Sequence, residues 1–239
     1  MSNVSSVIYA DSNWKGISLK SYSTMMALTH RTGSIALAAS LIAFVPELDR
    51  IPQPITDFIW LPQNTTIPLA VCFVVASCYG GLLPDADIPH STAGKHLRIL
   101  LWPFYLLKKI LLIFGHFIKP LKKIGTSLGH RGLFHSPLFH TLIFVMLSAL
   151  LRGHNEWLRC ILSGLYLGVL SHLLLDLFSG GIPLFAPFSM KRQRPAITFK
   201  TGSFLEAIFN LIFILISIYL LYITVLRFMR TSSFSSIFI

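Results

Sequence analysis

The chain has 239 residues, of which 54% are hydrophobic, 13% aromatic and only 12% charged. A soluble domain has about 25% charged residues, so this composition excludes an ordinary soluble enzyme and indicates an integral membrane protein. The formal net charge of +11 would also suit nucleic-acid binding. Lys and Arg collect in the cytoplasmic loops of membrane proteins, however, so we expect membrane lipid and not nucleic acid as their partner.

Five apolar segments approach the length of about 17–25 residues that a membrane-spanning helix needs. They cover residues 31–46, 67–83, 137–151, 158–178 and 204–226. Segment 97–118 is also apolar and aromatic, but Pro103, Lys108 and Lys109 interrupt it. We expect this segment to be an amphipathic helix that lies in the membrane interface, with a sixth spanning helix as the alternative. The predicted fold is therefore an all-α, multi-pass transmembrane bundle of about five spans plus an interfacial helix.

The polarity of the chain predicts a simple organisation. Residues 1–25 are polar and mixed, without a cleavable signal pattern, and we expect them to be partly disordered. Residues 26–230 form a single helical membrane domain in this prediction, and residues 231–239 form a tail. The cysteines Cys72, Cys78 and Cys160 lack metal-finger spacing, so they are expected to pack as small hydrophobic residues.

The distribution of positive charge predicts how the bundle is oriented. Eight Lys and Arg residues lie in segment 95–131, and four more lie in segment 191–200. The opposite loops are poorer in Lys and Arg, with Arg50 alone after the first expected span. By the positive-inside rule, the N-terminus should lie in the cytoplasm and the C-terminus outside.

His172 and Asp176 stand four residues apart in an apolar segment, so a helix would place both on one face. Ionisable residues inside a membrane are costly unless they are paired or bind a ligand, and they usually mark a functional site. In the expected topology, the cytoplasmic ends of the other spans carry the same residue types. These residues are His30, Asp85, Asp87, His130 and His135. We therefore predict a metal site where the spans meet.

Imidazole and carboxylate ligands suit zinc, manganese or iron, whereas a calcium site would contain oxygen ligands alone. We expect one or two divalent ions, with zinc or manganese favoured. Each cluster also has a simpler explanation. His30 could be an interfacial or capping residue, Asp85 and Asp87 could form a polar turn after Pro84, and His130 and His135 could be loop residues. His172 and Asp176 could form a hydrogen-bonded pair without a metal.

Two residues are predicted to have catalytic roles. The guanidinium of Arg131 could hold a phosphate group with paired hydrogen bonds. Asp87 or its neighbour Asp85 could act as a general base. Ser136 precedes Pro137 and is better explained as the N-cap of a helix than as a nucleophile.

Four motifs resemble, in order, those of the YdjM family of bacterial and archaeal inner-membrane proteins. The motifs are Thr29-His30 and segments 81–87, 130–136 and 171–176. The family is described as metal-dependent hydrolases and is associated in name with the SOS repressor. The resemblance covers residues 26–206 and implies a multi-pass protein of the bacterial inner membrane. It points to a ligand set of His30, Asp85, Asp87, His130, His135, His172 and Asp176. The chain departs from the family in its polar N-terminal extension and its long basic segment between the second and third motifs.

These observations lead to the hypothesis of a membrane-embedded, metal-dependent hydrolase whose His/Asp site faces the cytoplasm. A lipid or lipid-linked phosphoester is the expected substrate, because the site would lie at headgroup depth beside basic loops. The alternatives are an ion or metal transporter and a non-catalytic membrane scaffold with a structural His/Asp cluster. A transporter should place polar groups near the middle of the membrane, whereas here the outer ends of the spans are almost purely apolar.

Overall fold

A computed structural model describes residues 19–44, 60, 66–88, 91–117, 125, 132–153, 155–196, 198 and 203–235. Within these ranges the protein is all-helical and has no strands apart from one isolated bridge between Ile182 and Gln193. The expected all-α class is therefore confirmed for the described part of the chain.

The longer helices coincide with the apolar segments of the sequence. They are α1 (Leu19–Phe44), α3 (Ile67–Gly80), α5 (Arg98–Phe114), α7 (Pro137–Leu150), α8 (Glu156–Ser179) and α9 (Phe204–Ser235). Three short helices complete the fold: η2 (Leu83–Asp87), α4 (Thr92–His96) and η3 (Leu133–His135). Helix α1 begins well before the span expected from residue 31.

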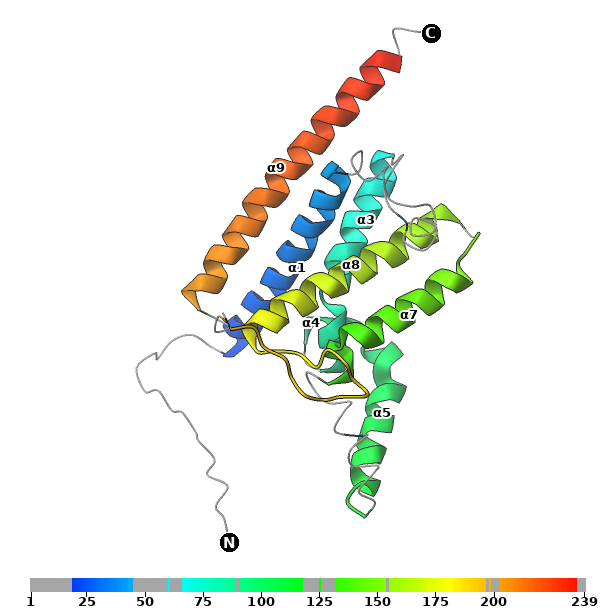
Figure 1. Ribbon diagram of the computed structural model, residues 1–239, viewed down its shortest axis with the longest axis vertical. Coiled ribbons are helices and arrows are strands. Elements are labelled where there is room, and N and C mark those ends of the chain that lie inside the picture. The colour runs from blue at the N-terminus through cyan, green and yellow to red at the C-terminus, as the bar shows by residue number, and fades with distance from the viewer. Residues whose placement is uncertain are drawn as a thin grey trace.

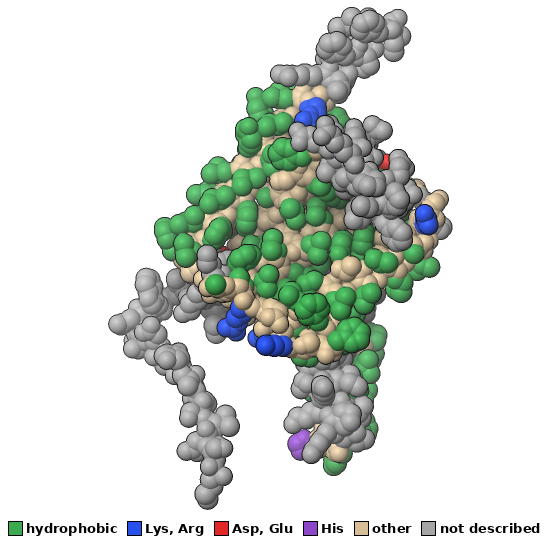
Figure 2. All heavy atoms as spheres, in the orientation of Figure 1, with side chains coloured by type: hydrophobic (Ala, Val, Ile, Leu, Met, Phe, Trp, Pro, Cys, Tyr) green, Lys and Arg blue, Asp and Glu red, His purple; other side chains and the backbone are tan. Residues whose placement is uncertain are grey.

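Two helical stretches, Glu156–Ser179 and Phe204–Met229, are long and apolar enough to cross a membrane. Helices α3 and α7 are apolar but shorter. The five-span architecture and the interfacial position of α5 therefore stay predictions. Many large hydrophobic side chains on α9 are exposed, for example Leu215 and Tyr219. Figure 2 shows the resulting apolar surface, which suits contact with lipid.

The helices are arranged around α1 and α8 (Figure 1). Helix α1 packs against α9, α3 and α8, while α8 also packs against α3 and α7. The C-terminal ends of α3 and α8 and the N-terminal end of α9 lie at the same end of the bundle, the lower end in Figure 1, with α5 extending below it. This arrangement brings the polar segments that follow α3 and precede α7 next to the end of α8.

Small residues allow α3 and α8 to approach closely. Gly164 and Gly168 lie one turn apart on α8, in the Gly-x-x-x-Gly spacing that favours close helix pairs in membranes. A Cβ atom at Gly164 would lie 2.7 Å from the carbonyl oxygen of Phe73, and one at Gly168 would overlap the carbonyl oxygen of Ser77. The backbone of α3 therefore lies against the same face of α8 that carries His172.

Candidate metal centre

Five of the predicted site residues come together from four separate elements. His30 lies on α1, Asp85 on η2, His135 on η3, and both His172 and Asp176 on α8. Four of their side chains are almost fully buried, and only the Asp85 side chain, at 21% exposure, is partly open to solvent. Access to this cluster is therefore greatest at Asp85.

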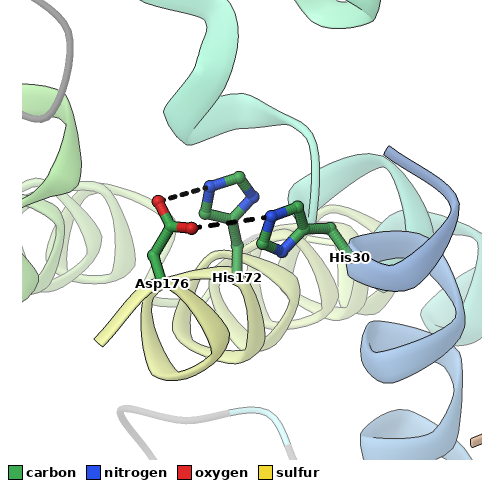
Figure 3. A group of neighbouring side chains, drawn as sticks. All are labelled: His30, His172 and Asp176. Carbon is green, nitrogen blue, oxygen red and sulfur yellow. Dashed lines mark ion pairs between the residues drawn. The ribbon is translucent and has the colours of Figure 1, made fainter. Parts of the chain in front are cut away.

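The carboxylate of Asp176 lies at the centre of the cluster. Its Oδ1 is 3.7 Å from Nε2 of His30, and its Oδ2 is 3.3 Å from Nε2 of His135 and 3.6 Å from Nε2 of His172. Figure 3 shows how His30 and His172 approach this carboxylate from neighbouring helices. Their rings stack with centroids 3.7 Å apart, so both Nε2 atoms face Asp176 from the same side.

Asp85, which lies on η2, completes the cluster. Its Oδ1 lies 3.5 Å from Nε2 of His135 and 3.8 Å from Nε2 of His172. Two groups of three potential ligand atoms result, each with all atoms within 4.8 Å of one another. The first contains His30, His172 and Asp176, and the second contains Asp85, His135 and His172. These buried groups could hold a metal ion.

The spacing of these atoms fits a shared ion better than direct hydrogen bonds. Hydrogen bonds between nitrogen and oxygen are about 2.7–3.2 Å long. The five distances in the cluster range from 3.3 to 3.8 Å. Ligands about 2.0–2.2 Å from a tetrahedral zinc ion would lie about 3.3–3.6 Å from one another. The donor set of imidazole nitrogens and carboxylate oxygens also suits zinc or manganese.

A hydrogen bond to the backbone orients His172. Its Nδ1 lies 2.7 Å from the carbonyl oxygen of Gly81, just beyond the end of α3. Because a carbonyl oxygen only accepts hydrogen bonds, Nδ1 carries a proton, and in the neutral ring Nε2 offers its lone pair to the cluster. This Nε2 is buried and has no hydrogen-bond partner among the described residues. Such a backbone contact is typical of a histidine that binds a metal.

His135 and Asp85, which lie outside the expected spans, have strongly shifted pKa values. Burial opposes the charged form of His135, but the close carboxylates of Asp176 and Asp85 outweigh it and raise the pKa to about 9. Burial likewise opposes the charged form of Asp85, but the close imidazole of His135 and the nearby His172 and His30 lower its pKa to about 2. Without a metal, the positive charge of a protonated His135 therefore lies between the two carboxylates.

The segment after α8 folds back beneath the cluster and supports it. The backbone N–H groups of Gly180 and Gly181 both donate to the carbonyl oxygen of Asp176, at 3.0 Å. Ser136 donates to the carbonyl oxygen of Ala186 at 2.9 Å, and its Oγ also accepts from the N–H of Phe139 at 3.4 Å. The expected N-cap role of Ser136 is confirmed. The same side chain ties His135 to this segment.

The remaining predicted residues are placed differently. Asp87 is 1% exposed and does not belong to either group of three ligand atoms. It lies near Tyr105, and burial together with the Asp87 charge raises the pKa of that phenol. His130 and Arg131 lie outside the described residues. The metal and catalytic roles expected for these three residues stay predictions.

Two parts of the site have no clear signature in the sequence. The acceptor at Gly81 is a backbone carbonyl, which has no signature of residue type. The supporting segment 180–193 contains few residues with obvious chemistry. The Gly164 and Gly168 spacing, by contrast, was visible in the sequence and would have indicated which helix packs against the His172 face.

Comparison with known proteins places the chain in a family. The model of the family described as YdjM inner membrane protein matches residues 25–233. The chain belongs to the YdjM family. The resemblance drawn from the four motifs is thus confirmed, and membership of an inner-membrane family supports an inner-membrane location. It does not by itself establish metal binding or hydrolysis.

Proteins similar to this chain come from several bacteria. Uncharacterized protein YvsG of Bacillus subtilis is 29% identical over 137 residues, which cover 57% of this chain and 69% of YvsG. Inner membrane protein YdjM of Escherichia coli is 30% identical over 129 residues, covering 52% of this chain and 54% of that protein. The Shigella flexneri YdjM protein gives the same figures. The match therefore spans about half the length of the two YdjM proteins. No solved structure matches the chain.

Proposed function

We propose that this protein is a multi-pass, metal-dependent hydrolase of the inner membrane, with a site that faces the cytoplasm and acts on a lipid or lipid-linked phosphoester. One observation carries the proposal. Imidazole nitrogens of His30, His135 and His172 converge with carboxylate oxygens of Asp85 and Asp176 at distances of 3.3 to 3.8 Å. A cluster that served structure alone would gain more from ordinary hydrogen bonds.

In this proposal, the five clustered residues hold one or two divalent ions, with zinc or manganese favoured. Such an ion supplies a bound water of lowered pKa and polarises a phosphoryl oxygen. Asp176 directs one oxygen toward His30 and the other toward His135 and His172, so its carboxylate would help to hold the metal. The partly exposed Asp85 would be the ligand that the substrate approaches first.

The surroundings of the cluster support a phosphate-bearing substrate. The C-terminal ends of α3 and α8 lie near the cluster, and the segment that follows α8 carries the exposed side chains of Lys191, Arg192 and Arg194. Positive charge beside the site would attract an anionic headgroup. We assign the binding of a phosphate oxygen to Arg131 and general-base catalysis to Asp87, with His130 as an additional metal ligand.

The test combines metal analysis with an assay on purified protein. Wild-type protein should contain about one or two zinc or manganese ions per chain and release phosphate or alcohol from a lipid phosphoester such as phosphatidic acid. Asp176→Asn should lower the metal affinity by at least about 10–100-fold. Losing a contact that supports a metal ligand costs about this much, and losing the ligand itself should cost no less. His96→Ala is the matched control and should retain both properties, because the His96 side chain is exposed at the end of α4.

Two results would contradict this function in different ways. Well-folded wild-type protein that binds no metal would favour the scaffold alternative, in which the cluster is structural. Stoichiometric metal without hydrolysis of any lipid phosphoester would favour the metal-handling alternative.

A further inference from the structure

A large apolar cavity lies between α8 and α9, at the end of the bundle that carries the metal centre. Its volume is about 520 Å³, within the range of cavities that bind small molecules. Its walls come from three residues of α8 and three of α9. These are Leu174, Leu175, Phe178, Leu205, Phe209 and Phe213. A cavity with almost entirely apolar walls selects a hydrocarbon ligand.

The cavity and the metal centre lie on different faces of the same part of α8. Leu175 directly precedes Asp176 on α8. Gly33 of α1 lies against two lining residues, because a Cβ atom there would lie 3.1 Å from Leu175 and 3.5 Å from Phe213. Gly33 is in turn less than one helical turn from the candidate ligand His30. A molecule in the cavity would therefore lie close to the cluster. Only α8 and the turn of α1 that contains His30 and Gly33 would separate the two.

The shape of the cavity matches an extended chain. Leu205, Phe209 and Phe213 follow one another at four-residue intervals, so they form a stripe along α9. At 1.5 Å per residue this stripe is about 12 Å long. It starts in the first turn of the candidate membrane span Phe204–Met229 and runs into its apolar part. This is the direction a lipid chain takes from the headgroup region into a bilayer.

The outer end of the cavity lies at a basic segment. Thr198, which also lines the cavity, belongs to the segment that joins α8 to α9. The same segment carries the exposed side chains of Lys191, Arg192 and Arg194. Figure 2 shows Lys and Arg side chains along this end of the molecule. An anionic headgroup would be attracted here, while its chain occupied the apolar cavity.

Local structure holds one of these cations against the end of α8. The bridge between Ile182 and Gln193 places Arg194 over Gly181, which has a φ of 76°. A Cβ atom at Gly181 would overlap the Arg194 side chain, so only glycine allows this approach. Arg194 is thus positioned near the α8 terminus that carries Asp176.

We propose that the cavity between α8 and α9 binds one hydrocarbon chain of an anionic phospholipid, whose phosphate lies at Lys191, Arg192 and Arg194. This inference rests on the proposed function and narrows its substrate to a lipid that enters sideways from the bilayer. A second apolar cavity of about 310 Å³ lies near Val71, Val225 and Met229. Its lining residues on α3 and α9 belong to the halves of these helices that are far from the metal centre. This second cavity therefore serves as an internal comparison.

The test uses phosphatidylglycerol as the probe and native mass spectrometry of the purified full chain. Wild-type protein should retain one phosphatidylglycerol molecule and bind phosphatidylcholine more weakly. Leu205→Trp should fill part of the cavity and weaken phosphatidylglycerol binding about tenfold. This is the loss expected if the Trp side chain keeps about two methylene groups of the lipid chain out of the cavity. Leu211→Trp is the matched control, because Leu205 and Leu211 are 53% and 57% exposed on the same helix and Leu211 lines neither cavity. Equal effects of the two variants would overturn the proposal, and equal binding of the two lipids would overturn the anionic specificity.

A second measurement needs no variant. Phosphatidylglycerol with a diazirine in its acyl chain should label residues 174–178 and 205–213 of wild-type protein in nanodiscs more strongly than residues 215–222. Uniform labelling along α9 would overturn the proposal. Both measurements are repeated with a chelator present, which should leave chain binding unchanged. Binding of the lipid chain without any hydrolysis would contradict the proposed function and leave this inference standing. Hydrolysis without lipid binding in the cavity would contradict this inference and leave the proposed function standing.

Discussion

The Nδ1–H of His172 donates a hydrogen bond of 2.7 Å to the carbonyl oxygen of Gly81, and this contact joins α8 to the end of α3. Gly81 follows α3, while His172 lies in the last third of α8. The contact exists because Gly164 and Gly168 allow the two backbones to approach. Helix packing and the orientation of a candidate metal ligand therefore depend on the same glycines.

We expect Gly168→Ala to lower both stability and metal occupancy. The added Cβ would overlap the carbonyl oxygen of Ser77, so α3 must move away and carry Gly81 with it. Overpacking of this kind costs about 1–3 kcal/mol. Thermal unfolding and metal content per folded chain would measure the two effects. Gly33→Ala is the control, because its Cβ would lie 3.1 Å from the end of a Leu175 side chain that can move. A Gly168→Ala protein with unchanged metal content would show that the backbone contact does not orient His172 for binding.

Ser136→Ala should weaken metal binding by a smaller amount. The variant loses an N-cap, worth about 0.5–2 kcal/mol, and also the contact of Ser136 with the Ala186 carbonyl. His135, the preceding residue, would then be held less firmly. Asn155→Ala provides the matched control, since Asn155 caps α8 by accepting from Trp157 at 2.8 Å at the opposite end of that helix. Equal losses of metal affinity in the two variants would mean that only general stability had changed.

Metal affinity should rise with pH between about 7 and 9. Because the pKa of His135 is raised to about 9, this side chain is protonated at pH 7 in the metal-free protein. A metal must displace that proton, so the apparent affinity should increase about tenfold per pH unit until His135 is neutral without metal. Calorimetry in two buffers of different ionisation enthalpy would detect the released proton. In His135→Ala, the number of protons released per bound metal ion at pH 7 should fall by about one. A metal affinity of the wild-type protein that did not depend on pH would contradict a ligand role for His135.

Hydropathy and residue type predicted a large part of this structure. The apolar segments gave the positions of α3, α7, α8 and α9, because a helix that faces lipid must be apolar over most of its length. The four-residue spacing of His172 and Asp176 correctly placed them together on one helix face. The start of α1 at Leu19 was missed, since polar residues continue the helix without an apolar signal. The fold-back of segment 180–193 was also missed, because it depends on tertiary contacts of Ser136 and the backbone of Gly181.

The orientation of the protein is a separate prediction. A reporter fused to the C-terminus should be active outside the cytoplasm, and a reporter fused after Lys122 should be active inside it, because Lys and Arg concentrate in segment 95–131. Paired alkaline phosphatase and fluorescent protein fusions would measure both positions. A cytoplasmic C-terminus would mean that segment 97–118 crosses the membrane or that one of the five expected spans does not.

The most direct test of the metal centre is X-ray absorption spectroscopy of the zinc-loaded protein. We expect a first shell of imidazole nitrogen and carboxylate oxygen at about 2.0–2.2 Å, with two or three histidines per ion and fewer in His172→Ala. The variant should remain folded while its metal content per molecule falls. A shell of oxygen alone, or an unchanged histidine contribution in folded His172→Ala, would contradict the account and leave the His/Asp cluster as a structural element.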